Sequence, residues 1–276
     1  MVNAVILAGG KREEYIKRDN WIYRTLLKYG RRIPGEEKAV MIYRGKPMIK
    51  WVIGALKNAK SIDDLVVVGN TIKLEESGIN DVVCLEQSTT ITQNAMIGYI
   101  YFKERGQEGR TLFVPCDIPE ISGNTLDGFV EKAKDGDFCF AMGDKKFLGE
   151  YDKFSRRFYI WAKKEGVRKR YRWSNLALVK PEAIKNKDMV EYAFSLRNIL
   201  DIRTWPKIAK VIGYKPFFDW ATFRLDLGDV ERRISEKFGC DFRVVEICDP
   251  SASFDLDYKN DPGKVLKWYQ LRNSKV

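Results

Sequence analysis

The chain has 276 residues, of which 45% are apolar, and it carries a net charge of +11 without a single histidine. This length suits one large α/β domain or two small ones. The lack of histidine excludes Ser-His-Asp triads, histidine-bound zinc and histidine general bases, so any catalysis has to use carboxylates, lysines, backbone amides and a hard metal ion. The positive charge indicates either a solvated basic surface or an anionic partner, which could be a phosphorylated small molecule, nucleic acid or an anionic membrane.

Signals for membrane insertion, export and disulfide formation are missing. No run of about 18 apolar residues is present, so no transmembrane segment is expected. The N-terminus has neither a basic segment nor a small-residue cleavage site, and we expect a cytoplasmic protein. The five cysteines are odd in number and form no C-x-x-C pair, which argues against a disulfide framework and against a structural zinc site.

Strands and helices alternate in the first half of the chain. Short apolar runs predict strands at 2–7, 65–68, 82–85, 111–114 and 138–142. Apolar spacing and capping residues predict helices from Pro47, over 92–103 and after Ser122. The basic, aromatic segment 11–37 predicts a long loop. This order predicts an α/β fold with a mostly parallel Rossmann-like sheet and helices on both faces.

The second half of the chain has a different pattern. Residues 144–180 predict antiparallel strands and loops, and 189–212 predict a helix interrupted at Trp205-Pro206. The aromatic-rich segment 213–223 is followed by elements that the apolar spacing predicts as a helix at 229–238, a strand at 242–247 and a last helix at 262–271. The chain is therefore expected to leave the sheet, build a small antiparallel and helical accessory region, and return.

A glycine pair follows the first predicted strand, in the segment Leu7-Ala8-Gly9-Gly10. Glycines at such a place let backbone N–H groups approach a phosphate or a base closely, although an isolated pair is also compatible with a simple tight turn. The chain has neither G-x-G-x-x-G nor the P-loop pattern at this position. Because ligands of parallel sheets bind outside the carboxyl ends of the strands, these glycines point to a site.

Charged residues lie near other predicted strand ends. Lys38 precedes an apolar run near a glycine and can neutralise phosphate charge. Asp117 follows the strand at 111–114 and can hold Mg²⁺ against substrate phosphates. Asp255 and Asp257 face the same way if their segment is extended, and Asp261 is placed to cap the last helix. Each also has an ordinary reading as a surface lysine, a capping aspartate or a polar turn.

Four segments in order along the chain carry a family resemblance. They are LAGG (7–10), KAVMIYRGKPMI (38–49), VPCDIP (114–119) and FDLDYKND (254–261). On these segments the chain resembles the MobA-like NTP transferases, which are GT-A-type nucleotidyltransferases that include molybdenum-cofactor guanylyltransferase and sugar-phosphate nucleotidyltransferases. The resemblance implies transfer of a nucleoside monophosphate from an NTP to a phosphorylated small-molecule acceptor, with release of pyrophosphate and dependence on Mg²⁺ or Mn²⁺.

The resemblance also implies roles for residues of this chain. Leu7, Ala8, Gly9 and Gly10 would line the nucleotide pocket, together with Gln93 and Asn94 at the base or ribose. Lys38 would bind phosphate and act in catalysis. Asp117 would be a catalytic residue and the first metal ligand, and Asp257 the second. The single domain 1–276 would comprise a nucleotide-binding half (1–143), an accessory acceptor region (144–227) and a return to the sheet with the second metal aspartate (228–276).

One segment departs from the family pattern. Relatives reach the phosphate-binding lysine soon after a short glycine-rich loop that contains an arginine. Here Lys11-Arg12 follows the glycines, and a long insertion comes before Lys38. We interpret Arg12 as the phosphate-contacting, catalytic arginine.

The accessory region leaves several alternatives open. Its basic stretch 163–172 is interleaved with aromatic residues and can capture a phosphorylated acceptor, with Arg170, Arg172 and Asn175 as candidate contacts. The same stretch is also typical of a solvated hairpin, and its third interpretation is a groove for nucleic acid. The aromatic segment 205–223 can be core, a homodimer contact or a membrane-surface contact.

Two rival functions remain open beside nucleotidyl transfer. A GT-A glycosyltransferase would also use aspartates and a metal ion, but it would cleave a nucleotide-sugar. A non-catalytic protein that binds nucleotides or nucleic acid would use the glycines and the positive charge alone. The combination of LAGG with Lys38 favours the nucleotidyltransferase.

Overall fold

The computed structural model describes residues 1–9, 35–147, 159–196 and 205–256. Gly10, Arg12 and Asp257 lie outside the described residues, as do Asp261 and the last helix expected at 262–271. None of the described helices is long and apolar enough to span a bilayer.

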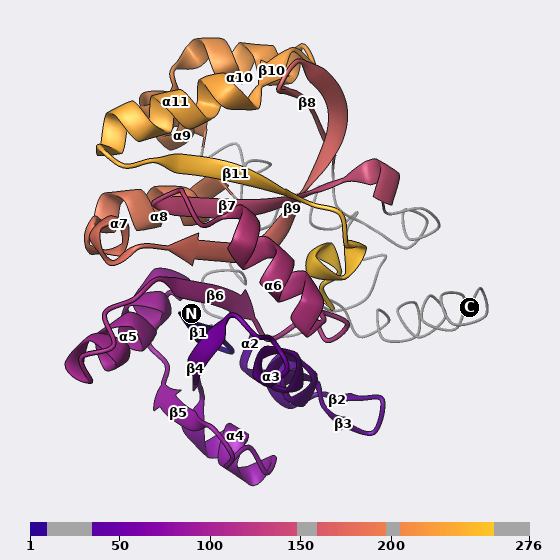
Figure 1. Cartoon of the computed structure of the whole chain (residues 1–276), viewed down its shortest axis with the longest axis vertical. Coiled ribbons are helices and arrows are strands. Elements are labelled where there is room, and N and C mark those ends of the chain that lie inside the picture. The colour runs from indigo at the N-terminus through magenta and orange to yellow at the C-terminus, as the bar shows by residue number, and fades with distance from the viewer. Residues whose placement is uncertain (10–34, 148–158, 197–204, 257–276) are drawn as a thin grey trace, which may run out of the picture.

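Four parallel strands form the first half of a nine-stranded sheet (Figure 1). Strand β1 (Val2–Leu7) lies between β4 (Ile62–Gly69) and β6 (Thr111–Pro115), and β5 (Val83–Glu86) pairs with β4 on the far side. All six residues of β1 are buried, which explains why its sequence is apolar except for Asn3 and does not alternate between apolar and polar residues. The carboxyl ends of these strands meet at one edge of the sheet.

One long strand, β9 (Val167–Val179), joins this half to the rest. It runs antiparallel to β6 through its carboxyl part and to β8 (Ile160–Lys164) through its amino part, and it pairs with β7 (Phe138–Asp144) on the opposite side. Two parallel neighbours complete the sheet: β11 (Phe242–Ile247) beside β7, and β10 (Leu225–Asp226) beside β8. The hairpin of β8 and β9 therefore extends beyond the carboxyl end of β6.

Helices cover both faces of the sheet, each through an apolar stripe. One face is covered by α5 (Ile91–Glu104), α7 (Pro181–Lys185), α8 (Lys187–Leu196), α9 (Trp205–Ile212) and α11 (Leu227–Phe238). The other face is covered by α2 (Gly35–Val40), α3 (Met48–Lys57), α4 (Thr71–Glu76) and α6 (Gly123–Lys132). The predicted fold, a mostly parallel sheet with helices on both faces and a small antiparallel and helical accessory region, is confirmed.

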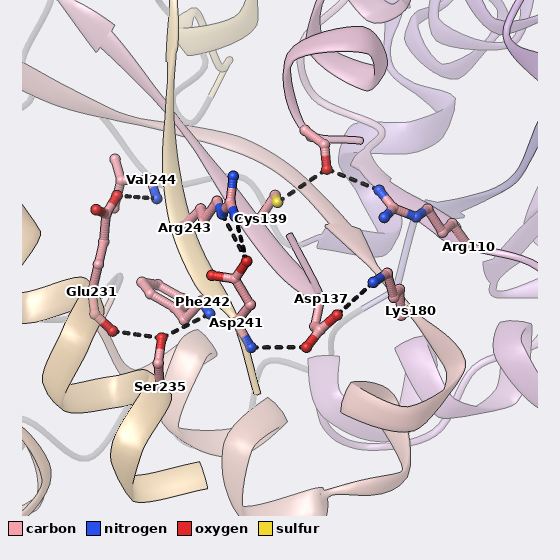
Figure 2. A network of polar contacts seen from close by, with 11 residues as sticks. Arg110, Asp137, Cys139, Lys180, Glu231, Ser235, Asp241, Phe242, Arg243 and Val244 are labelled. Carbon is pink, nitrogen blue, oxygen red and sulfur yellow. Dashed lines mark hydrogen bonds and ion pairs between the residues drawn. The ribbon is translucent and has the colours of Figure 1, made fainter. Parts of the chain in front are cut away.

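A polar network fixes the amino ends of β7 and β11 (Figure 2). The Asp137 carboxylate accepts a hydrogen bond from Lys180 Nζ at 2.6 Å and one from the Asp241 amide at 2.8 Å. On α11, Glu231 accepts from the Val244 amide at 2.6 Å. These bonds secure the strand that returns to the sheet at the end opposite to the predicted site.

One short helix differs from the sequence-based expectation, and two others add detail to it. Helix α2 begins at Gly35, inside the segment predicted as loop up to residue 37. Helix α9 begins at Trp205, where the sequence predicts an interruption, and Pro206 lies in its first turn, where a missing N–H costs nothing. The aromatic-rich segment forms α10 (Tyr214–Ala221), because its aromatic residues recur at helical spacing.

Candidate active site

Gly9 lies at the carboxyl end of β1 in contact with two amide side chains. A Cβ atom at this position would lie 2.2 Å from Gln87 Oε1 and 2.9 Å from Asn94 Nδ2. The preceding residue, Ala8, is fixed by a hydrogen bond of 2.8 Å from its amide to Val68 O. Only glycine at position 9 allows Gln87 and Asn94 to approach the backbone this closely.

Asn94 presents a buried donor beside Gly9. Its side chain is fully buried, and Oδ1 accepts a hydrogen bond of 2.6 Å from the Ser88 amide. Nδ2 has no hydrogen-bond partner among the described residues. Leaving a buried N–H unpaired costs about 1–3 kcal/mol, so an acceptor atom of a ligand would be favoured at this place.

Gln93 caps the start of α5. Its Oε1 accepts hydrogen bonds from Ser88 Oγ at 2.9 Å, Thr89 Oγ1 at 2.8 Å and the Thr90 amide at 3.1 Å. Thr90 Oγ1 in turn accepts from the Gln93 amide at 3.2 Å, which completes a capping box. The contact of Gln93 with a nucleotide stays a prediction, although its side-chain oxygen is already shared by three donors.

Lys38 and Asp117 meet at the carboxyl end of β6. Lys38 lies in the last turn of α2, and its Nζ is 2.7 Å from Asp117 Oδ2. Both side chains are largely buried, with exposed fractions of 8% for Lys38 and 14% for Asp117. The other carboxylate oxygen, Oδ1, is buried and has no hydrogen-bond partner in the described part of the chain. The structure thus brings together two residues that the sequence singled out separately.

The segment after the short 3₁₀ helix η6 (Pro250–Ser253) lies against the same edge. Ser174 Oγ of β9 donates to Ala252 O at 2.6 Å, and the Leu256 amide donates to Asp117 O at 2.9 Å. These two bonds bring residues from the end of the described chain directly beside Asp117.

Asp255 and Arg172 form a buried ion pair at this place. Asp255 Oδ1 lies 3.7 Å from the Arg172 guanidinium, and their side chains are 5% and 3% exposed. The same guanidinium lies 5.8 Å from the centre of the Phe254 ring. The carboxylate and the aromatic ring fix the position of this guanidinium.

The three predicted acceptor contacts occupy different environments. Asn175 is buried in β9, like Arg172. Arg170 is exposed on the β8–β9 hairpin, where its guanidinium lies 4.4 Å from the centre of the Trp161 ring. The structure therefore brings Arg172 to the carboxyl edge of the sheet beside Asp255 and places Arg170 farther out along the same strand.

Three comparisons with known proteins bear on this geometry. The model of the MobA-like NTP transferase domain matches residues 4–173. The chain belongs to this family. It is accordingly a nucleotidyltransferase, and the enzyme class predicted from the sequence is confirmed. No curated protein matches the chain.

Solved structures share the fold of this MobA-like transferase over nearly its whole length. A hypothetical transferase from Thermus thermophilus has 23% identity and a TM-score of 0.67, covering 95% of this chain and 100% of its own. A CMP:2-keto-3-deoxy-manno-octonic acid synthetase complexed with CTP has 10% identity and a TM-score of 0.55, covering 100% and 99%. A nucleotidyl transferase from Methanothermobacter thermautotrophicus has 14% identity and a TM-score of 0.52, covering 99% of each chain.

Two residues of the site were not selected as functional by the sequence reasoning. Gln87 is buried against Gly9, and its position directly after β5, at the same edge as the other strand ends, is the signal that could have found it. Asp255 was noted only as a neighbour of Asp257. Its partner Arg172 lies far away in the sequence, so no local pattern predicts the ion pair.

The donor set fits a divalent cation that NTP transferases commonly use. The buried oxygen Asp117 Oδ1 is a hard ligand of the type that Mg²⁺ prefers. The hydrogen bond from the Leu256 amide to Asp117 O holds Leu256, the residue before Asp257, beside Asp117. Within the described ranges no group of three or more acidic or cysteine side chains could hold a metal ion. The neighbouring Cys116 stays a neutral thiol, because burial raises its pKa far above the usual value.

Proposed function

We propose that this enzyme transfers a nucleoside monophosphate from an NTP to a phosphorylated small-molecule acceptor and releases pyrophosphate. The observation that carries the proposal is the pair of Lys38 and Asp117, buried at the carboxyl edge of a parallel sheet beside the segment that ends at Leu256. The buried ammonium group of Lys38 can contact a phosphate, and the second carboxylate oxygen of Asp117, Oδ1, can bind a metal ion.

The nucleotide is proposed to bind over Gly9. Gln87 and Asn94 lie so close to Gly9 that no side chain would fit at this position, and Asn94 Nδ2 supplies a donor for an acceptor atom of the base or ribose. Leu7 and Ala8 are buried in the core and would support the pocket through the backbone. Gly10 and Arg12 belong to the proposed pocket and lie outside the described residues.

In the proposed reaction an acceptor phosphate oxygen attacks the α-phosphorus of the NTP. A P–O bond forms to the acceptor while the P–O bond to the β-phosphate breaks, and pyrophosphate leaves with the bonding electron pair. Lys38, with Arg12, would stabilise the negative charge that develops on pyrophosphate. Mg²⁺ or Mn²⁺, held by Asp117 and Asp257, would neutralise phosphate charge and orient the reacting groups when bound.

The acceptor is proposed to bind at the accessory region, residues 144–227. Arg172 is the strongest candidate for its phosphate, because Asp255 and Phe254 fix the guanidinium at the edge where Asp117 lies. In this proposal residues 1–143 bind the nucleotide, and residues 228–276 supply the second metal aspartate.

The test measures pyrophosphate release with each NTP, Mg²⁺ and a panel of sugar phosphates, polyol phosphates and phosphonates. CTP belongs in the panel because a solved structure of the same fold was complexed with it. Asp117→Asn is expected to lower the rate at least about 100-fold. The control Asp135→Asn removes an exposed carboxylate and is expected to keep the wild-type rate. An Asp117→Asn protein that kept the wild-type rate would refute the proposed site, and turnover of nucleotide-sugars instead of NTPs would favour the glycosyltransferase.

A further inference from the structure

An exposed basic surface extends from the candidate site along β9. Side chains at every second position of a strand share one face, so Arg168, Arg170 and Arg172 form a row with a spacing of about 7 Å. Arg172 is buried beside Asp255, whereas Arg168 and Arg170 are exposed. The row therefore begins at the candidate site and continues onto the surface.

The neighbouring strand widens this surface. In the β8–β9 hairpin, Trp161 pairs with Arg170 and Lys163 pairs with Arg168, so all four side chains lie on one face. The guanidinium groups of Arg168 and Arg170 lie 5.6 Å and 4.4 Å from the centre of the Trp161 ring. Lys163 is exposed, and exposed Arg224 comes directly before β10, the strand that pairs with β8. Lys163, Arg168, Arg170 and Arg224 are called the basic face below.

Exposed aromatic side chains lie at the same end of the molecule. Tyr214 and Phe218 are one helical turn apart on α10 and are 81% and 62% exposed, and Phe223 is 57% exposed. The Arg168 guanidinium donates to Phe223 O, which ties this residue to the hairpin. Figure 1 shows α10, β10 and β8 together at one end of the long axis of the molecule. Tyr214, Phe218 and Phe223 are called the aromatic tip below.

We propose that the aromatic tip and the basic face dock this protein on an anionic membrane surface. Aromatic side chains at a protruding end can enter the region between headgroups and acyl chains, and the adjacent lysine and arginine side chains can contact anionic headgroups. Apolar insertion and electrostatic attraction are the two contributions that reversible membrane binding requires. This inference does not depend on the reaction that the enzyme catalyses.

Charge and shape favour a bilayer over two other occupants. A second copy of this chain would bring another basic face, and the strands that carry this face contribute only Glu165 and Asp226 as acidic residues around it. A nucleic-acid strand would use exposed rings as stacking platforms along its basic track. The ring on the basic face, Trp161, is instead covered by two guanidinium groups, and the freely exposed rings lie at the end of the molecule.

The test is flotation of the protein with vesicles of phosphatidylcholine alone or mixed with an equal amount of phosphatidylglycerol. Binding is expected only with phosphatidylglycerol, and it should fall as salt is added. The variant Lys163→Gln/Arg170→Gln lowers the charge of the basic face and spares Arg168, which has a structural bond. The variant Phe218→Ser/Phe223→Asn removes two rings, with asparagine chosen because residue 223 has a φ of 60°. Each variant is expected to weaken vesicle binding about 10-fold or more.

Control variants remove exposed apolar or positively charged side chains outside the aromatic tip and the basic face. Ile72→Ser alters an exposed apolar residue of α4, and Lys60→Gln/Lys103→Gln removes two exposed charges. These controls should bind vesicles like the wild type, and unchanged thermal unfolding should show that every variant is folded. Wild-type affinity in the Phe218→Ser/Phe223→Asn variant would overturn the proposal. So would binding of a single-stranded oligonucleotide without binding of vesicles, or dimerisation through the aromatic tip in sedimentation analysis.

Discussion

The ammonium nitrogen of Lys38 lies 2.7 Å from Oδ2 of Asp117, so the carboxylate proposed to hold the metal ion is already neutralised by the lysine proposed to bind phosphate. A cation bound at the other oxygen, Oδ1, therefore competes with Lys38 for the negative charge of the same carboxylate. An NTP would resolve the competition, because its phosphates offer Lys38 another anionic partner.

The first prediction concerns this competition. In Lys38→Met, binding of Mn²⁺ without nucleotide is expected to become tighter, whereas NTP binding weakens and kcat/KM falls about 100-fold. Mn²⁺ affinity is measured by electron paramagnetic resonance. Lys60→Met serves as the control at an exposed site. Unchanged or weaker Mn²⁺ binding in Lys38→Met would show that the lysine does not occupy the metal position.

The second prediction uses two glycines. Gly9→Ala would force Gln87 to move, since the new Cβ would lie 2.2 Å from Gln87 Oε1, and a loss of about 1–3 kcal/mol in unfolding free energy is expected. NTP binding should weaken in the same protein. Gly54→Ala lies in α3 with no heavy atom within 4 Å of the new Cβ, and it is expected to stabilise by about 0.5–1 kcal/mol. Denaturant unfolding and nucleotide titration measure both effects. Equal behaviour of the two variants would contradict the close packing at Gly9.

The third prediction concerns the buried donor of Asn94. Asn94→Asp keeps an oxygen for the Ser88 amide and removes the Nδ2 donor. Affinity for the preferred NTP is expected to fall at least about 10-fold, because one hydrogen bond, which corresponds to about 1.4 kcal/mol, is lost and a buried carboxylate is added beside an anionic ligand. Calorimetric titration of wild type and variant with each NTP provides the measurement. If the affinities for all nucleotides stayed the same, Asn94 would have no contact with the ligand.

The fourth prediction is a dependence of stability on pH. The hydrogen bond from Lys180 lowers the pKa of Asp137 below its usual value of 3.8, with the Asp241 amide as a further cause. The ionised form therefore stabilises the fold fully above that value, and the contribution is lost as the pH falls through the lowered pKa. Asp137→Asn should unfold more easily by about 1 kcal/mol at neutral pH, and the difference should shrink in acid. Urea unfolding across the acidic range tests this, and a constant difference would contradict it.

Local sequence patterns predicted the fold well, because most helices and strands have a characteristic spacing of apolar residues. The strand predicted at 242–247 coincides with β11, and the helix predicted at 92–103 lies within α5. The short helix α2 lies in a basic, aromatic stretch without a clear apolar stripe, so the loop predicted through residue 37 was wrong at that point. The helix α10 carries aromatic residues that the sequence left unassigned, because the same residues suit core, interface and surface.

The site was predictable where it follows strand ends and unpredictable where it depends on distant partners. Gly9 and Asp117 follow strands whose parallel order places their ends together, and the structure brings Lys38 to Asp117. The link of Asp255 to Arg172 joins η6 and β9 through a buried ion pair, which no spacing along the chain reveals. Gln93 takes part in the capping box at the start of α5, which the order Thr90 to Gln93 suggests locally, and its contact with a nucleotide stays a prediction.

The amide of Leu256 reaches back to Asp117, although more than a hundred positions separate these residues in the chain. During synthesis on the ribosome, the glycines, Lys38 and Asp117 emerge long before Asp255 does. A nascent chain can therefore form the first parallel strands before Asp255 is available to pair with Arg172. The proposed site, which needs both Asp117 and Asp255, is therefore complete only after the segment that follows η6 has been synthesised.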